Sequence, residues 1–305
     1  MPELPDIKTY QKVMETHLLG QRLLKIRLGS PFLLRSVTPP LSLLEQREVK
    51  QILRLGKRLV LGLEGSFYLV LHLMIVGRLH WKPPGTSLPR KSGLALFDFD
   101  HGSLLLTESS TRKRASLYAV HGAVALAAHD PGGLDLLTTT LAEFHTRLNS
   151  GNNTLKRALT DPKRFDGIGN AYSDEILHAA GLSPLQLTGN LSDLEVERLF
   201  LACQSTLRLW IDRLLAEAKG GFPKRVTAFH SKMAVHGKYR QPCPTCHSPI
   251  QRIVQGEREV NYCPTCQTGG KVLADRAWSK LLKKDWPQTL EGWEDMIKPP
   301  PNPSS

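Results

Sequence analysis

The chain has 305 residues, 41% of them hydrophobic, which allows about two domains with packed cores and excludes general disorder. Its net charge of +12, from 40 Lys and Arg against 28 Asp and Glu, favours nucleic acid over a membrane as partner. No apolar run approaches the roughly 20 residues that span a bilayer, and no secretory signal opens the chain, so we expect an intracellular protein of the cytoplasm or nucleoid that binds no membrane.

The first part of the chain predicts strands led by one helix. The stretch PDIKTYQKVMETHLLG has apolar residues at helical spacing and a glycine at its end. Two hairpins are predicted by runs of alternating apolar residues around short turns: RLVLGL with FYLVLHL, and LALFDF with SLLLTE. We therefore expect a β-rich N-terminal domain over residues 1–130.

Helical patterns replace the strands after the stretch HDPGGLDLL. NNTLKRALTD predicts one helix, and SDEILHAAGLSP a second with Ser173 as its N-cap and Gly181 at its end. A long third helix starts at a capping box of Ser192 and Glu195. Its buried stripe is predicted to be Val196, Leu199, Cys203, Leu207, Trp210 and Leu214. We expect a helical domain over residues 131–222.

Four of the five cysteines form two CPTC pairs separated by sixteen residues: Cys243, Cys246, Cys263 and Cys266. Two such turns can complete a tetrahedron of thiolates around one metal, and four protein ligands leave no open position for catalysis. The sequence therefore predicts one structural zinc ion in a finger over residues 223–268. Between the pairs lies a predicted hairpin, from which we expect Arg258 to contact nucleic acid and Arg252 to be solvated.

The stretch FDGIGNAYSDEILHAAGLSP is a second candidate binding site. Gly167 and Gly169 bracket a turn before a helix, where backbone N–H groups and the positive helix end can approach a phosphate. The Asn170 amide and the Lys156 ammonium could reach the same phosphate. The alternative is an ordinary helix–turn–helix, because Gly-x-Gly alone is weak support for a binding site.

In order and spacing, MPELPD, GKR around Lys57, GIGNAYSDEILHAAGLSP and the cysteine pairs resemble the formamidopyrimidine-DNA glycosylase and endonuclease VIII family. The resemblance implies an α+β multidomain fold: an N-terminal β-sandwich with a leading helix, a helical helix–two-turn–helix domain and a four-cysteine zinc finger. It also implies a bifunctional DNA glycosylase and abasic-site lyase of base excision repair. Its partner would be damaged double-stranded DNA, and we expect a monomer.

The resemblance assigns the chemistry to the N-terminus. Removal of Met1 would expose Pro2 as a secondary amine and nucleophile, since an α-amino group titrates at roughly 7.7–8.0 and is partly free near neutral pH. Glu3 would be the acid and base, and Lys57 would reach the damaged nucleotide or its phosphate. Contacts to DNA phosphates are implied for three further residues: Lys156, Asn170 and Arg258.

Several stretches depart from the family's pattern. His-Leu-Gly-Met of the purine-specific members is HLMI here, so Met74 is expected to fill the gap left by the flipped base, with Ile75 or a core position for Met74 as alternatives. The usual Arg-Phe pair is missing from TESSTRKRASLY, where Arg112, Lys113 and Arg114 could enter the duplex or bind phosphate. Asp6 replaces a glutamate. An extension over 269–305 follows, with a possible short helix in WSKLLKKDW and a disordered end.

MPELP resembles the purine-specific branch of the family more than MPEGP does. The resemblance therefore implies oxidised purines, such as 8-oxoguanine and formamidopyrimidines, removed through a Pro2 Schiff base with β,δ-elimination. Oxidised pyrimidines or bulkier adducts are the alternatives, and the missing Arg-Phe pair leaves the preferred opposite base open. A protein that binds lesions without cutting is the alternative from another class. The joint presence of Pro2, Glu3 and Lys57 disfavours it, because a binder needs no nucleophile.

Overall fold

The computed structural model describes residues 1–223, 229–255, 258–274, 282, 287 and 289–297, without the side chains of 255, 258, 294 and 297. The chain forms two compact units, which we describe separately. The first comprises Met1–Thr139, Asp161–Ile168 and Leu207–Ala228, and the second Thr140–Thr160, Gly169–Thr206 and Phe229–Ser305. The division into four segments expected from the sequence stays a prediction.

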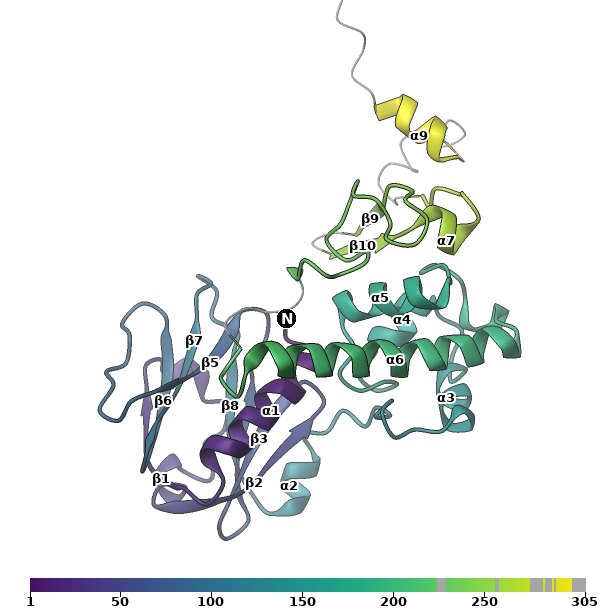
Figure 1. Cartoon of the computed structure of the whole chain (residues 1–305). Helices are drawn as coiled ribbons and strands as arrows, with labels where there is room; N and C mark the ends of the chain where they lie inside the picture. The colour runs from purple at the N-terminus through teal and green to yellow at the C-terminus, as the bar shows by residue number, and fades with distance from the viewer. Residues whose placement is uncertain (224–228, 256–257, 275–281, 283–286, 288, 298–305) are drawn as a thin grey trace, which may run out of the picture. The chain divides into compact units, whose positions relative to one another are not determined.

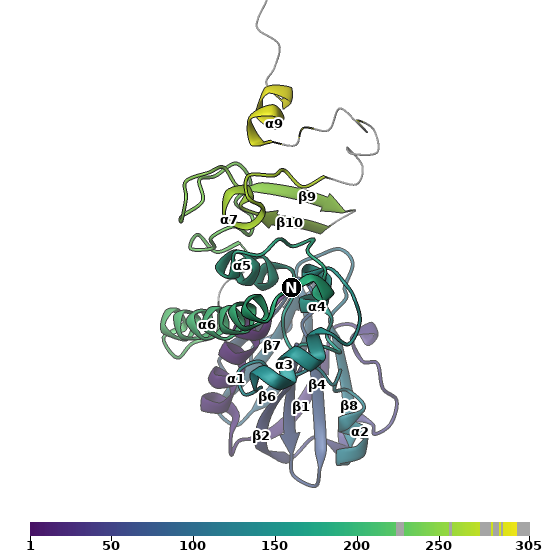
Figure 2. The ribbon, with the colours of Figure 1, turned by 90° about the vertical axis from the view of Figure 1, so that its right-hand side faces the viewer.

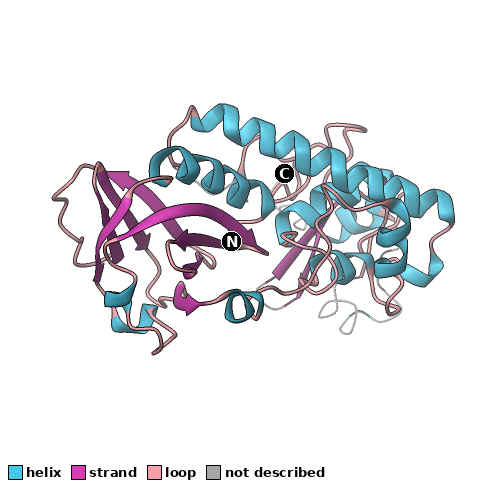
Figure 3. Cartoon of the chain, turned by 90° about the horizontal axis from the view of Figure 1, so that it is seen from below, coloured by secondary structure: helices cyan, strands magenta, loops and turns pink. Residues whose placement is uncertain are grey.

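Within the described residues, the first unit contains one antiparallel sheet in the order β5-β7-β6-β1-β2-β3-β4-β8. Most of its strands are labelled in Figure 1, and strands are magenta in Figure 3. Its strands are β1 (Arg22–Leu28), β2 (Arg47–Leu55), β3 (Arg58–Leu63), β4 (Phe67–His72), β5 (Gly77–Lys82), β6 (Gly93–Phe99), β7 (Gly102–Glu108) and β8 (Ser116–His121). The two hairpins predicted from alternation are confirmed as β3–β4 and β6–β7.

One hydrophobic core joins the two halves of this sheet. Only two residue pairs link β1 to β2, whereas the neighbouring strands pair over longer stretches. Leu61 and Leu69 from one half pack in the same cluster as Phe97 and Leu104 from the other. Because side chains alternate along a strand, Val60 points to the opposite face, into a small cluster beside helix α2 (Ala123–Ala127). The sheet therefore folds over its own core, as a sandwich does.

The leading helix is confirmed as α1 (Leu4–Leu18). Ile7, Tyr10, Met14 and Leu18, the apolar residues at helical spacing, are all buried in the core of the sheet domain. The first unit therefore holds the N-terminal end of α1 rigidly.

The second unit is mainly helical. It contains α3 (Leu141–Leu148), α4 (Leu155–Thr160), α5 (Asn170–Ala180), the first turns of α6 (Asp193–Ala218), strands β9 (Gln251–Gln255) and β10 (Arg258–Tyr262), α7 (Pro264–Thr268) and α9 (Leu290–Ile297). A short 3-10 turn occurs at Thr188–Asn190, and the first unit has two others, at Pro31–Leu33 and Leu41–Leu43. Helix α5 packs against β10 and α7 (Figures 1 and 2). None of the helices in the described ranges is long and apolar enough to cross a membrane.

The capping box of the long helix is confirmed. Ser192 N donates to Glu195 Oε2 at 2.9 Å, and Glu195 N donates back to Ser192 Oγ at 3.4 Å. The predicted stripe of α6 is buried in full, and burial raises the pKa of the Cys203 thiol, as expected for core filler.

Ser173 does not cap α5, and that prediction is wrong. The helix begins at Asn170 with Gly169 as its N-cap, so Ser173 lies within the first turn. Its Oγ donates to the Gly169 carbonyl at 2.5 Å, because a serine inside a helix can bond to the carbonyl four residues before it. Gly181 ends the helix in the left-handed conformation, as predicted. The stretch WSKLLKKDW and the last eight residues of the chain lie outside the described residues.

Candidate active site and metal centre

The N-terminal segment is held in place by its own helix. Pro2 and Glu3 are buried, and Glu3 is the N-cap of α1. The Glu3 N–H donates to Asp6 Oδ2 at 2.9 Å as one half of a capping box. Asp6 at this position therefore has a structural role, since it fixes the backbone that carries Pro2 and Glu3.

Gly167 anchors the same segment from another loop of the first unit. Its carbonyl accepts the Leu4 N–H at 2.9 Å, and its backbone adopts φ +77°. A Cβ added to Gly167 would lie 2.7 Å from the Leu4 Cβ, which is too close for any side chain. The glycine expected to face a phosphate thus also packs against the start of α1. The binding of a phosphate there stays a prediction.

We expect Gly167→Ala to destabilise the protein and to slow chemistry at the N-terminus. The positive φ and the contact with Leu4 should together cost about 1–3 kcal/mol of the free energy of unfolding. Gly132→Ala is the matched control, because Gly132 has φ +78° in the same unit but open space around its Cα. Denaturant unfolding and borohydride trapping on abasic DNA would measure both effects. Equal losses in the two variants would contradict the role of the Leu4 contact.

Charged groups surround the N-terminal amine. Burial lowers the pKa of the Met1 amine, the charges of Arg78 and Lys57 lower it further, and Glu3 and Asp6 oppose them. Burial likewise lowers the pKa of Lys57, opposed by Glu3 and Asp166. The structure thus brings three sequence-predicted site residues, Pro2, Glu3 and Lys57, into one electrostatic environment. Arg78, on β5, was not anticipated from the sequence, because no motif marks it.

The pKa of the Met1 amine leads to a prediction about pH. Once Met1 is removed, we expect the Pro2 amine to titrate below the usual 7.7–8.0, so trapping should stay fast into the neutral range. Arg78→Gln removes a positive charge that disfavours the protonated amine. The acid limb of the trapping rate should therefore move to higher pH, with a several-fold loss at pH 6.5 and none at pH 9. Arg22→Gln, at an exposed arginine of β1, should leave the profile unchanged.

The turn that carries Lys57 is fixed by an ion-pair network. Gly56 and Lys57 form the two-residue turn between β2 and β3, with Gly56 at φ +62°. The Arg54 guanidinium donates to the Gly56 carbonyl at 2.9 Å, to Asp135 Oδ2 at 2.7 Å and to Asp166. Arg54 therefore ties the turn to two segments more than 80 residues away in the chain.

The turn at residues 73–77 carries both candidates for filling the gap left by a flipped base, Met74 and Ile75. Met74 is half-buried and adopts φ +53°, a conformation that glycine takes without strain. The Gly77 N–H closes the turn on the Leu73 carbonyl at 2.9 Å, and Ile75 is 46% exposed. Met74 therefore adopts a backbone conformation that suits glycine, and Ile75 beside it is exposed. Which of the two fills the gap left by a flipped base stays a prediction.

The buried Glu108 carboxylate holds the loop over 109–114 by hydrogen bonds, and no sequence motif marks this residue. This carboxylate is 1% exposed and accepts from the Arg114 N–H at 2.9 Å and from Ser110 Oγ at 3.2 Å. The Lys113 ammonium donates to the Glu108 carbonyl. The Arg112 side chain is exposed at the tip of the loop. It is therefore available to a partner, whereas Lys113 is tied to the loop.

In the second unit, Lys156 and Asn170 lie together, as the phosphate hypothesis requires. The Lys156 ammonium donates to the Asn170 carbonyl at 2.6 Å and to Asp174 Oδ1 at 2.5 Å, and the residue is 9% exposed. The Asn170 amide donates to the Glu259 carbonyl of β10 at 2.8 Å. Lys156 thus positions the first residue of α5 through two bonds of its own.

Two buried acids of α5 extend this network, and neither was anticipated. Asp174 Oδ2 pairs with His236 Nδ1 at 2.7 Å and accepts the Asn261 N–H at 3.2 Å. The Glu175 carboxylate accepts three consecutive backbone N–H groups, from Ala234, Val235 and His236, at 2.7 to 2.9 Å. The only sequence signal was a pair of acids inside a helix with apolar neighbours. These bonds fix α5 to the segment that leads into the cysteine module.

The hairpin between the cysteine pairs is confirmed as β9 and β10. Arg252 is largely exposed, pairs with Glu259 Oε2 at 3.0 Å and lies over the Tyr239 ring at 4.3 Å, so it is not simply solvated. Arg258 opens β10 and pairs with Gln255 in the backbone ladder, but its side chain lies outside the described part of the chain. Its contact with DNA stays a prediction.

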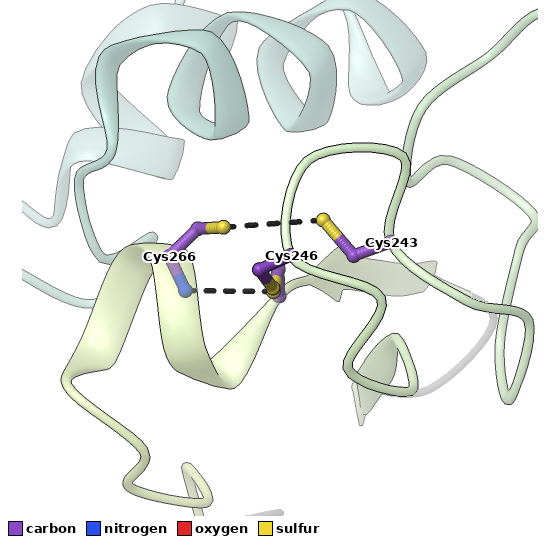
Figure 4. Close-up of side chains that lie close together, drawn as sticks. Cys243, Cys246 and Cys266 are labelled. Carbon is purple, nitrogen blue, oxygen red and sulfur yellow. Dashed lines mark hydrogen bonds between the residues drawn. The ribbon is translucent and has the colours of Figure 1, made fainter.

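The four cysteines of the two CPTC pairs converge on one point. Their sulfur atoms all lie within 4.8 Å of one another, and no disulfide joins them. The sulfurs of Cys243 and Cys266 point toward each other (Figure 4) and are 3.9 Å apart. Those of Cys246 and Cys263 are 3.3 Å apart. A tetrahedron with metal–sulfur bonds of about 2.3 Å needs sulfurs about 3.8 Å apart, so the cluster fits a four-coordinate metal. With every position filled by sulfur, the metal is structural.

Three family models match consecutive parts of the chain. The formamidopyrimidine-DNA glycosylase N-terminal domain matches residues 1–116, and the H2TH domain of the same glycosylase matches residues 133–215. A zinc finger found in FPG and IleRS matches residues 240–269. The matches end at residue 269, where the extension predicted over 269–305 begins.

Named relatives agree with these models. An uncharacterized formamidopyrimidine-DNA glycosylase-like protein of Mycobacterium tuberculosis is 39% identical over 153 residues, which cover 50% of this chain and 93% of the relative. The formamidopyrimidine-DNA glycosylase of Carboxydothermus hydrogenoformans is 30% identical over 278 residues, which cover 88% of this chain and all of the relative.

Solved structures share the fold. The MutM (Fpg) protein of Thermus thermophilus is 28% identical with a TM-score of 0.72, over 87% of this chain and 98% of that one. The Lactococcus lactis Fpg in complex with abasic-site DNA has a TM-score of 0.78 at 23% identity, over 87% and 99% of the two chains. The predicted fold class is confirmed: a sheet domain with a leading helix, a helical H2TH domain and a four-cysteine finger.

Proposed function

This chain belongs to the formamidopyrimidine-DNA glycosylase family, and from that premise we propose that it excises oxidised purines from double-stranded DNA and then nicks the strand. The observation that carries the proposal is the buried Pro2-Glu3 segment, with Lys57 beside it and an amine whose pKa is lowered. A lesion-binding protein without chemistry has no use for a buried N-terminal amine whose pKa is lowered. The target base must leave the stack to reach this segment.

The first step is an attack by the Pro2 nitrogen on the sugar C1′ after removal of Met1. The new N–C1′ bond replaces the glycosidic bond, whose electron pair leaves with the base. Opening of the sugar ring gives an iminium, and Glu3 supplies the proton that the ring oxygen takes up. Burial of the segment supports this step, because burial disfavours the protonated form of an amine, as the lowered pKa of the Met1 amine indicates, and excludes competing water.

Strand cleavage follows from the iminium. It acidifies the neighbouring sugar protons, so the 3′ phosphate leaves by β-elimination and the 5′ phosphate by δ-elimination, each with its bonding electron pair. Glu3 is the nearest base named by the resemblance, and the Lys57 ammonium can offset the negative charge of the departing phosphate. Hydrolysis of the iminium then returns Pro2 to its free state.

The remaining predicted contacts hold the DNA. Asn170 at the start of α5 binds a backbone phosphate, and Lys156, whose charge is paired with Asp174, holds the Asn170 carbonyl beside that phosphate. Arg258 binds a second phosphate, and Arg112 reaches the duplex from the exposed loop tip. Met74 fills the gap left by the flipped nucleotide, with the exposed Ile75 beside it as the alternative.

The metal of the cysteine cluster is zinc in this proposal. A set of four thiolates in tetrahedral arrangement is the donor set that zinc prefers, and zinc would stabilise the finger without entering the reaction. The protein acts as a monomer on damaged DNA.

A nicking assay on duplexes that bear 8-oxoguanine, thymine glycol or an abasic site tests the proposal. We expect cutting of the 8-oxoguanine and abasic duplexes, with products that carry phosphate at both ends of the gap. Faster cutting of thymine glycol would move the substrate to oxidised pyrimidines. Cutting of no duplex, by protein that has lost Met1, would overturn the enzymatic mechanism and leave lesion binding.

A further inference from the structure

A histidine outside the four-cysteine set touches the metal centre. His178, on α5, places its Nε2 3.2 Å from the Cys243 sulfur. The residue is half-buried, and the sulfur belongs to one of the four ligands that complete the metal site. The two CxxC pairs account for the metal by themselves, so nothing in their spacing announces this contact.

We propose that His178 donates its Nε2–H to the metal-bound Cys243 thiolate and thereby couples the metal centre to α5. The inference rests on the proposed zinc. The direction of the bond follows from the chemistry, because a metal-bound cysteine has lost its proton and can only accept. A donor to the thiolate disperses its negative charge and fixes the direction of the sulfur lone pairs. His178 is thus a positioning residue for the metal and not a fifth ligand.

The bond lies at the C-terminal end of α5, where a second bond supports it. The Gln267 amide of α7 donates to the Leu182 carbonyl, just beyond the helix, at 2.9 Å. At the other end of α5, the Asn170 amide donates to the Glu259 carbonyl of β10. The cysteine module therefore holds the helix at both ends. A metal that fixes Cys243 also fixes, through His178, the helix whose first residue is the proposed phosphate ligand.

Replacement of His178 by phenylalanine removes the N–H donor but keeps an aromatic ring in its place. The variant therefore tests the hydrogen bond separately from side-chain packing. Hydrogen-bonding partners of metal ligands typically contribute about 10–100-fold to metal affinity. We expect zinc-loaded H178F to release zinc to a chelator about 10–100 times faster than the wild type. H178Q, whose amide can donate from a similar place, should restore most of the difference. His145→Phe is the matched control, since His145 lies exposed on α3 and bonds to Asn149 of its own unit.

A cobalt-loaded protein gives a second readout, which lost packing alone would not move. Loss of an N–H donor makes the thiolate a better electron donor, so its sulfur-to-cobalt charge-transfer band should shift to longer wavelength in H178F. The band should stay in place in His145→Phe and return toward the wild type in H178Q. If H178F does not fold, His178→Leu, whose side chain also lacks a hydrogen-bond donor, is used in its place.

These measurements distinguish a failure of the His178 hydrogen bond from a failure of the proposed zinc site. A wild-type protein that binds no zinc would contradict the proposed metal, and the role of His178 with it. Tight zinc binding by the wild type, with equal release rates and equal cobalt spectra in H178F, would overturn the hydrogen bond alone. Faster release without a shift of the band, or without rescue by H178Q, would show that His178 acts only through packing.

Discussion

A single glycine left in front of Pro2 is expected to lower both borohydride trapping and strand nicking by at least about 1,000-fold. The extra residue converts the Pro2 nitrogen into an amide, whose lone pair is delocalised into the carbonyl and cannot attack the sugar. The new glycine amine is about 3.8 Å further along the chain, and misplacement by about 1 Å can already cost about 100-fold. The proteins would be released from a cleavable tag and assayed on an abasic duplex.

The control for this experiment is the same tagged protein cleaved to begin at Pro2. It should trap as well as the native chain, which excludes an effect of the tag. Binding to an uncleavable abasic analogue should change little, since the extension alters the nucleophile and none of the proposed phosphate contacts. Trapping at the native rate with the extra glycine in place would assign the covalent bond to another amine.

Arg54→Met is expected to cost about 3–5 kcal/mol of the free energy of unfolding near neutral pH, because it leaves Asp166 charged and buried without a cation. The side chains of Arg54 and Asp166 are 6% and 13% exposed, so solvent screens this pair little. Asp135, the second partner, is 32% exposed and should contribute less. Because Arg54 also holds the Gly56 carbonyl, activity should fall in the folded variant as the Lys57 turn loosens.

The sign of the pH dependence provides a check. Burial raises the pKa of Asp166 even with Arg54 present, and loss of Arg54 should raise it further. A carboxyl whose folded pKa is raised binds more protons in the folded state, so its penalty is greatest at neutral pH and declines as pH falls through that pKa. The deficit of Arg54→Met relative to the wild type should therefore shrink between pH 7 and pH 5. Denaturant unfolding at several pH values would measure it.

Two further variants isolate the buried charge. Addition of Asp166→Asn to Arg54→Met should recover more than half of the lost stability, because the orphaned charge is gone. Arg27→Met removes the partner of Asp98 in the same unit, where the side chains are 35% and 20% exposed, and should cost only about 1 kcal/mol. Equal losses at Arg54 and Arg27 would show that burial does not set the strength of these pairs.

Local rules determined much of this protein from the sequence alone. Alternation in RLVLGL and FYLVLHL, the capping box of Ser192 and the spacing of the cysteines each concern residues that are neighbours in the chain or repeat with a fixed period. Backbone geometry turns such patterns directly into strands, helix ends and metal ligands. The N-cap predicted at Ser173 was wrong, because the helix starts three residues earlier, at Asn170, and Gly169 is its N-cap.

Only the tertiary structure decided which distant groups meet. Arg54 donates to Asp135 and Asp166, which are 81 and 112 residues away in the chain. The His178 ring contacts the Cys243 sulfur, which is 65 residues away. The sequence around each of these residues does not specify its distant partner, because folding of the chain, and not local spacing, brings the two groups together. The opening MPELPD joins both cases. The resemblance of the sequence marked Pro2 and Glu3 as reactive, and Asp6 caps their helix from only three residues away, whereas only the fold brought the Gly167 carbonyl to the Leu4 N–H.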